Sequence, residues 1–243
     1  MIGPGSDKKS KSPNSVFSSV ICPPPQVGLL DADIFGPSLP VMLGVDEQPL
    51  LDERDKMVPL QSLGLSCMSM GLLVDPKAAV VWRGPMVMGA LDKLVHGTAW
   101  EGTDVLVVDT PPGTGDIHLS LAQTVDLAGS VIISTPQKVA LADARKGIDM
   151  YRKMEVPVLG LVQNMASFLC PSCGAQTHVF GCEGASKLAT EEGIPLLGSI
   201  PLDPALMAGS DSGQPLVISN PESVVSQTYT EIAQKLLQLL QTI

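Results

Sequence analysis

The chain has 243 residues, of which 44% are hydrophobic, 16% charged and only 3% aromatic, and its formal net charge is −10. An acidic chain with few aromatic rings has neither the basic stripe that neutralises phosphates nor the platforms that stack on bases, which argues against a nucleic-acid partner. No apolar run approaches the ~20 residues that span a bilayer, so we expect no transmembrane segment. The length suits one large α/β domain.

Residues 1–26 differ in composition from the rest of the chain. They are rich in Ser, Lys and Pro, and Lys8, Lys9 and Lys11 lie close together. Because such a composition buries little apolar surface, we predict an atypical, disordered N-terminal segment at 1–26 and a folded domain at 27–243. The segment has no Arg and no amphipathic stretch, so we recognise no mitochondrial presequence in it.

From Val27 onward, short apolar runs alternate with longer amphipathic ones. The expected strands are Val27–Leu30, two short strands or a hairpin within Met57–Leu73 broken at Gly64, Asp104–Asp109, Ser130–Ser134, Val156–Val162 and Pro195–Ile200. The expected helices are Pro85–His96, Asp116–Val125, Ala140–Met154, Gly184–Glu192 and Pro221–Leu240. This alternation predicts βαβ units and an α/β fold with a mostly parallel sheet flanked by helices, whose ligand site lies at the carboxyl ends of the strands.

Two acidic motifs follow predicted strands. Asp109 ends an apolar strand and precedes a Gly-rich loop, where an Asp can hold Mg²⁺ through water and Gly113 lets the backbone approach a phosphate. Asp31 and Asp33 follow the first strand, where two carboxylates can position a metal and a water. The plain alternative for each motif is an acidic turn that ends a strand. Their presence together favours the functional interpretation.

Cys170 and Cys173 form a C-x-x-C motif on a predicted Cys-containing insertion at Phe168–Phe180, and His178 and Cys182 follow closely. Two thiolates at this spacing reach one metal but do not close a tetrahedral site. The motif therefore fits half of an iron–sulfur site completed by a second subunit, an intrachain zinc site that uses His178 and Cys182, or a redox dithiol. The spacing alone does not choose between zinc and iron–sulfur.

Three further residues follow predicted strands at positions where an adenine can sit in a parallel sheet. Asn164 comes after the strand at 156–162, and Pro201 and Asp203 come after the strand at 195–200. On the sequence alone, ordinary strand-ending turns explain these three residues better.

Taken together, these motifs resemble the Mrp family of deviant P-loop ATPases, MinD-like α/β proteins that carry iron–sulfur clusters. The resemblance covers about residues 27–243 and rests on DADIFGPS (31–38), VWRGPM (81–86), VDTPPGTGD (108–116), STPQ (134–137), NM (164–165) and CPSC (170–173). CMSMGL (67–72) and MVM (86–88) look most like the mitochondrial nucleotide-binding protein-like branch, which supplies clusters for the assembly of respiratory complex I.

The resemblance implies a homodimer that holds one [4Fe–4S] cluster between two Cys170/Cys173 pairs and delivers it to apo iron–sulfur client proteins. It favours iron–sulfur over zinc, and it implies the mitochondrial matrix, with the cytoplasm as the alternative. It also implies ATP and Mg²⁺ in the cleft beside the Gly-rich loop, with these roles: Asp31 in the cofactor-binding cluster, Asp33 positioning water, Asp109 holding Mg²⁺, Gly113 sensing the γ-phosphate, and Asn164, Pro201 and Asp203 near the adenine.

The chain departs from this family at one place. Family members carry a strand, a Gly-Lys-Gly-Gly-Val-Gly-Lys-Ser/Thr phosphate loop and a helix before the strand that corresponds to Val27–Leu30, whereas here no Gly is followed by Lys and residues 1–26 occupy that position. We therefore expect unpaired backbone inside the sheet and weak or absent ATP hydrolysis. The alternative functions are a nucleotide-independent, dimerising binding module and an intrachain zinc-binding protein.

Overall fold

The computed structural model describes residues 24–73, 84–170 and 172–242. Its strands are β1 (Val27–Asp31), β2 (Leu60–Ser62), β3 (Leu65–Ser69), β4 (Val105–Asp109), β5 (Ser130–Ser134), β6 (Val158–Gln163), β7 (Phe168–Leu169), β8 (Gln176–Thr177) and β9 (Leu196–Ser199). Its helices are α1 (Leu39–Leu43), α2 (Gly84–His96), α3 (Asp116–Thr124), α4 (Lys138–Lys153), α5 (Gly184–Glu192), α6 (Pro204–Asp211), α7 (Leu216–Ser219) and α8 (Val224–Leu240), with a 3₁₀ turn, η1, at Met70–Leu72. Over this part of the chain, no helix is both long enough and apolar enough to cross a membrane.

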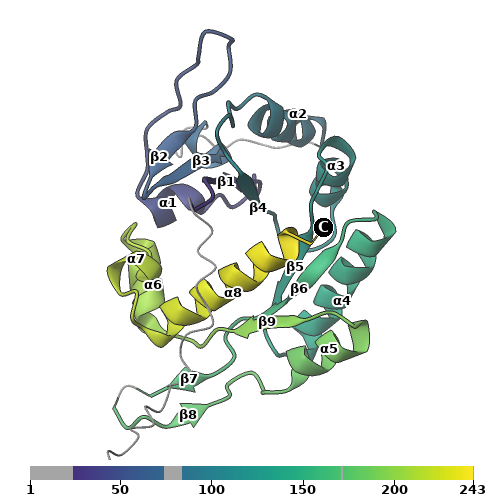
Figure 1. Ribbon diagram of the computed structural model, residues 1–243, viewed down its shortest axis with the longest axis vertical. Helices are drawn as coiled ribbons and strands as arrows, with labels where there is room; N and C mark the ends of the chain where they lie inside the picture. Colours follow the sequence, from purple (N-terminus) through teal and green to yellow (C-terminus); the bar gives the residue numbers. More distant parts are fainter. Residues whose placement is uncertain (1–23, 74–83, 171, 243) are drawn as a thin grey trace, which may run out of the picture.

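The main strands form two sheets, with the orders β2-β3-β1-β4 and β5-β6-β9. All of their pairings are parallel except that of β2 with β3, which is the expected hairpin around Gly64. In Figure 1 the strands follow one another as β2, β3, β1, β4, β5, β6 and β9, with the break between β4 and β5. The α/β class with mostly parallel strands is confirmed, and within the described residues the sheet is interrupted where the sequence predicted a missing strand.

The first sheet is covered on both faces. Leu30 and Met68, which are fully buried, pack with apolar residues of α2 and α3, including Leu91 and Leu94. The neighbouring residue Cys67 packs on the opposite face against α1. This alternation follows from the two-residue period of a strand.

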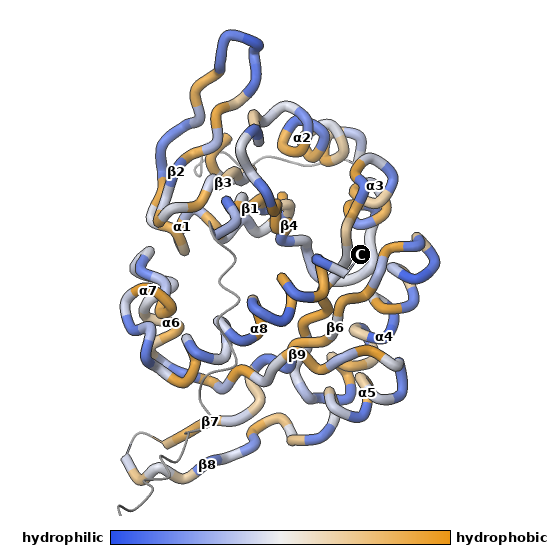
Figure 2. Tube along the Cα trace, in the orientation of Figure 1, coloured by the Kyte–Doolittle hydropathy of each residue, from blue (hydrophilic) through white to orange (hydrophobic). Residues whose placement is uncertain are grey.

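The second sheet has the same construction. Leu161 of β6 packs with Ile148 of α4 and with α5, whereas the next residue, Val162, packs with Val225 of α8. Figure 2 shows the hydrophobic colour concentrated along β4, β6 and β9, with hydrophilic residues on the outer turns of the helices. The hydrophobic core is therefore divided into separate clusters on either side of the break between β4 and β5.

Most of the expected elements lie within a few residues of their predicted bounds, and local chemistry explains the shifts. Helix α8 begins at Val224 rather than Pro221, because the Ser223 side chain caps it by accepting a hydrogen bond from the Ser226 backbone N–H. Helices α1, α6 and α7 were not predicted, since each is too short to show a clear apolar period. The predicted segment at 1–26 lies almost wholly outside the described residues.

Candidate functional site

The carboxyl ends of β1 and β4 bring together three acidic residues, Asp31, Asp33 and Asp109, which we call the aspartate edge. Asp31 and Asp109 are directly opposite each other in the parallel pairing of the two strands. One residue further on, the Ala32 N–H donates a 2.8 Å hydrogen bond to the Asp109 carbonyl oxygen. Two motifs that are 78 positions apart in the sequence (31 and 109) thus meet at one edge, as the parallel arrangement predicted.

Asp31 holds the loop that follows β1. Its side chain is fully buried, and its Oδ1 accepts a hydrogen bond from the Asp33 N–H. Its Oδ2 accepts hydrogen bonds from the Ser38 N–H, the Leu39 N–H and the Ser69 hydroxyl at 3.0–3.2 Å. The carboxylate therefore satisfies the backbone at the start of α1 and ties the loop to β3. A contact between Asp31 and a cofactor stays a prediction.

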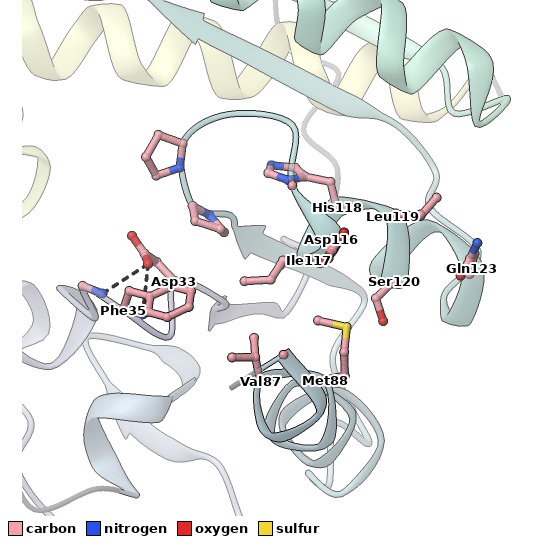
Figure 3. Close-up of a pocket in the computed structure, with 15 residues that line it drawn as sticks. Asp33, Phe35, Val87, Met88, Asp116, Ile117, His118, Leu119, Ser120 and Gln123 are labelled. Carbon is pink, nitrogen blue, oxygen red and sulfur yellow. Dashed lines mark hydrogen bonds between the residues drawn. The ribbon is translucent and has the colours of Figure 1, made fainter. Parts of the chain in front are cut away.

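Asp33 points from the same loop toward open space. Its Oδ1 accepts hydrogen bonds from the Phe35 and Gly36 N–H groups, both at 3.2 Å, as the dashed lines in Figure 3 show. Its other oxygen accepts no hydrogen bond from the described residues. Asp33 is thus held in a fixed orientation with one oxygen free to bind water, which fits the predicted role.

The surroundings of Asp109 at this edge change the pKa of its carboxyl group. Loss of hydration around its carboxyl group, followed by the negative charges of Asp31 and Asp33, raises its pKa above the usual range. A cation beside Asp109 would lower this pKa again, because it would favour the ionised form. The aspartate edge therefore attracts cations and repels phosphates.

The Gly-rich loop between β4 and α3 is open. Gly113 has a φ of +98°, which favours glycine, and a Cβ built there would meet no atom within 4 Å. Beneath this loop lies His118, which is buried, makes an edge-on contact with Tyr151 at 6.2 Å between ring centroids and has a pKa lowered by burial. Its Nδ1 has no hydrogen-bond partner within the described residues. No motif of the sequence indicated that His118 lies under this loop.

A cavity of about 800 Å³ opens beside the aspartate edge, between α2 and α3. Figure 3 shows Asp33 and Phe35 on one side, Val87 and Met88 from α2 below, and Ile117 and other α3 side chains opposite. Its walls are mainly apolar, with Asp33 and Asp116 as acidic groups at the lining. The sequence did not predict this cavity, because it depends on how two separate helices pack.

The predicted adenine contacts lie elsewhere, at the ends of β6 and β9, and they do not line this cavity. The Asn164 N–H donates to the Ser134 carbonyl oxygen at 2.8 Å, and its side-chain Oδ1 accepts from the Met165 N–H. Asp203 caps α6 by accepting from the Ala205 N–H at 2.8 Å. The structure places Asn164, Pro201 and Asp203 after neighbouring strands, while their contact with adenine stays a prediction.

Cys170 and Cys173 lie on a hairpin formed by β7 and β8, which we call the thiol hairpin. The Cys170 N–H donates to the Ala175 carbonyl oxygen at 3.0 Å, and the Gly174 N–H donates to the Cys170 carbonyl oxygen at 2.8 Å. Both thiols are free, and Cys173 is exposed. Figure 1 shows the hairpin at the lower end of the molecule, away from β1 and β4.

The hairpin also favours the thiolate form. Hydrogen bonds from the backbone N–H groups of Ser172 and Cys173, the first of these being the larger effect, lower the pKa of the Cys170 thiol. A thiolate is the form that binds iron or zinc. Within the residues that the structure describes, no three His, Cys, Asp or Glu side chains converge on one metal position. The intrachain zinc site that uses His178 and Cys182 stays a prediction.

A family model described as "NUBPL iron-transfer P-loop NTPase" matches residues 17–237. The chain belongs to this family. It is 50% identical over 213 residues to an Arabidopsis thaliana protein named "Iron-sulfur protein required for NADH dehydrogenase, mitochondrial" and 49% identical over 216 residues to the mouse "Iron-sulfur cluster transfer protein NUBPL". These matches cover 88% and 89% of this chain and 68% of each relative.

The solved structures support the same fold. A nucleotide-binding protein from Archaeoglobus fulgidus, described in complex with ADP, superposes with a TM-score of 0.69 at 35% identity, covering 82% of this chain and 77% of the other. The cell-division ATPase MinD of Pyrococcus furiosus superposes with a TM-score of 0.62 at 22% identity, covering 88% of this chain and 86% of the other, which shows the shared fold alone. The predicted MinD-like P-loop NTPase architecture is confirmed.

Proposed function

We propose that this protein carries an iron–sulfur cluster on the thiol hairpin and delivers it to apo iron–sulfur proteins, including those of respiratory complex I. The observation that carries the proposal is the pair of free thiols on one tight hairpin, with the pKa of Cys170 lowered by backbone N–H groups. The relatives named for iron–sulfur transfer and for NADH dehydrogenase support both the cargo and the clients.

The ligand count leads to a dimer. A [4Fe–4S] cluster is held by four Cys ligands, and one hairpin supplies two. Two copies that bring their thiol hairpins together would supply four, with the cluster as transferable cargo between them. Exposure of Cys173 leaves the hairpin open to such an approach.

Nucleotide fits this chain less well than the cluster does. The chain has no Gly followed by Lys, and the aspartate edge presents carboxylates where phosphates would need cations. We therefore propose cluster binding that is independent of ATP, with weak or absent ATP hydrolysis. Titration calorimetry with Mg-ATP tests this: we expect no saturable heat, and robust Mg²⁺-dependent turnover by the pure protein would refute it.

The ligand set can be tested with a pair of cysteine variants. After anaerobic incubation with iron and sulfide, we expect the wild type and Cys182→Ser to take up the same amount of cluster, and Cys173→Ser to lose it. Circular dichroism of each apo-protein shows whether the fold is retained. If Cys182→Ser binds no metal and metal analysis finds zinc in the wild type, the intrachain zinc site is correct and the carrier proposal fails.

The compartment is proposed from the relatives. The Arabidopsis thaliana protein is named as mitochondrial, so we propose the mitochondrial matrix, with the cytoplasm as the alternative. Fractionation of cells that express the tagged chain decides between the two.

A further inference from the structure

Strands β4 and β5, which lie in the middle of the succession of strands, each have one edge without a partner among the described residues. Within the described residues, β4 pairs only with β1, and β5 pairs only with β6. Figure 1 places β4 and β5 next to each other in the succession of strands, so both unpaired edges lie at the break between the sheets. We call this break the strand gap.

The strand gap exposes groups that strands in the middle of a sheet normally bury. Val107 of β4 is 48% exposed and Ile133 of β5 is 65% exposed. An unpaired edge also leaves backbone N–H and C=O groups free to bond to another extended segment. Both the apolar side chains and the backbone favour filling the strand gap with one more strand.

The chain enters the described fold close to this gap. The Gln26 carbonyl oxygen accepts hydrogen bonds from the Asp104 and Val105 N–H groups, and the Gln26 N–H donates to the Asp104 carboxylate at 2.7 Å. Residues before Gln26 are therefore tethered at the amino end of β4, one strand spacing from the gap. Such a tether gives an effective concentration in the millimolar range.

The composition of residues 1–26 predicted disorder, but this part of them has a complementary edge to bind. We propose that Val16–Cys22 of this same chain occupies the strand gap as an extra strand, antiparallel to β4 and β5. The segment reads VFSSVIC, with apolar side chains at positions 16, 17, 20 and 21, and it contains no Pro. Val16 and Val20 would face one side of the sheet, and Phe17 and Ile21 the other. Both faces of the strand would therefore bring apolar side chains to the divided core.

The length of the linker between the proposed strand and β1 favours one strand direction. The gap lies two strand spacings from β1, roughly 9.6 Å. Three prolines and Gln26 connect Cys22 to β1, and in the extended polyproline form these four residues reach about 12 Å. An antiparallel strand ends at the amino side and needs only this span. After a parallel strand, the linker would have to run back along the length of the strand as well, a span of roughly 19 Å in all. Such crossovers need about a dozen residues.

Charge supports the same direction. An antiparallel strand would begin at the carboxyl ends of β4 and β5, so the residues before Val16 would emerge at the aspartate edge. These residues include Lys8, Lys9 and Lys11, which are opposite in sign to Asp33 and Asp109. The inference does not depend on the proposed cluster function, because no thiol of the hairpin takes part in it.

Hydrogen exchange of the full chain tests the insertion. We compare the wild type with Ile21→Asp, which puts a charge into the inserted strand, and with Ser6→Asp, which puts the same charge outside it. Exchange of the β4 and β5 amides should be at least tenfold faster in Ile21→Asp than in the other two proteins, while β6 stays protected in all three. Equal β4 and β5 protection in the three proteins would overturn the proposal.

Cross-linking tests the direction and the source of the strand. Cys170, Cys173 and Cys182 are first replaced by Ser, which leaves Cys22 in place. A second cysteine is then introduced at one end of β5, as Ser130→Cys, or at the other, as Ser134→Cys. A short bismaleimide is used to link Cys22 to the introduced cysteine. We expect a link to position 130 within monomers. A link to position 134, links only between chains (a second copy in the gap) or no link at all would each contradict the proposal.

Discussion

Replacing Asp31 with Ala should destabilise the domain strongly, although Asp31 belongs to a predicted ligand site. The Asp31 carboxylate is fully buried and accepts four hydrogen bonds. Two of their donors, the Leu39 N–H and the Ser69 hydroxyl, are buried and would have no water to replace the lost acceptor. The perturbation therefore acts on the start of α1 and on the contact between β1 and β3.

The magnitude follows from the unsatisfied donors. Each buried donor left without a partner costs about 1–3 kcal/mol, so two of them cost about 4 kcal/mol. Removing the charge also relieves repulsion with Asp109, but that carboxylate reaches solvent, so we limit the gain to about 1 kcal/mol. The cost of the lost hydrogen bonds should exceed the gain from relieved repulsion, so the free energy of unfolding should fall by about 3 kcal/mol.

Urea unfolding of Asp31→Ala and of Ser69→Ala gives the comparison. The Ser69 variant removes one of the four donors to Asp31 and the acceptor of the Gly71 N–H, so it should lose only about 1–2 kcal/mol. Both variants should keep the wild-type denaturant dependence. If Asp31→Ala loses no more stability than Ser69→Ala, the structural role assigned to Asp31 is wrong.

The other predictions concern single residues. Because the pKa of Asp109 is raised in the fold, the stability that its protonated form contributes is lost as the pH rises through that pKa. Asp109→Asn should therefore raise the thermal midpoint at about pH 7 and leave it unchanged at about pH 3. A lower midpoint at neutral pH would contradict this. The Cys67 thiol is buried and its pKa is raised, so Ellman's reagent should modify it only after unfolding, whereas fast reaction in the native protein would place it at the surface. A Cβ at Gly160 would lie 2.7 Å from the Pro195 carbonyl oxygen, so Gly160→Ala should cost about 1–3 kcal/mol in urea unfolding. Gly89→Ala, on the exposed side of α2 with no atom near its Cβ, should instead gain about 0.5–1 kcal/mol, and equal effects of the two would refute the packing argument.

The sequence predicted the elements that carry their own signal. The apolar runs of β1, β4, β5 and β6 are unambiguous, and acidic or polar residues mark where the first two end. Because parallel strands share one carboxyl edge, Asp31, Asp33 and Asp109 could be placed together before any coordinates. The sequence also placed both thiols of the C-x-x-C motif on one insertion, Phe168–Phe180, and the thiol hairpin lies within it.

The sequence could not predict features that depend on pairing between distant segments. The hydrogen bonds of Asp31 come from Ser38, Leu39 and Ser69, and no local pattern assigns the carboxylate to them rather than to a ligand. The cavity between α2 and α3 and the burial of His118 under the Gly-rich loop arise from packing alone. The short helices α1, α6 and α7 are defined by caps and prolines rather than by an apolar period.

The most direct test of the cluster-carrier function is anaerobic reconstitution with iron and sulfide, followed by size exclusion with iron, sulfide and zinc analysis of each peak. The account predicts a brown dimer with about four irons per two chains, held by the two thiol hairpins. A colourless monomer, or a monomer that binds zinc, would contradict it and would leave the family's function unassigned for this chain.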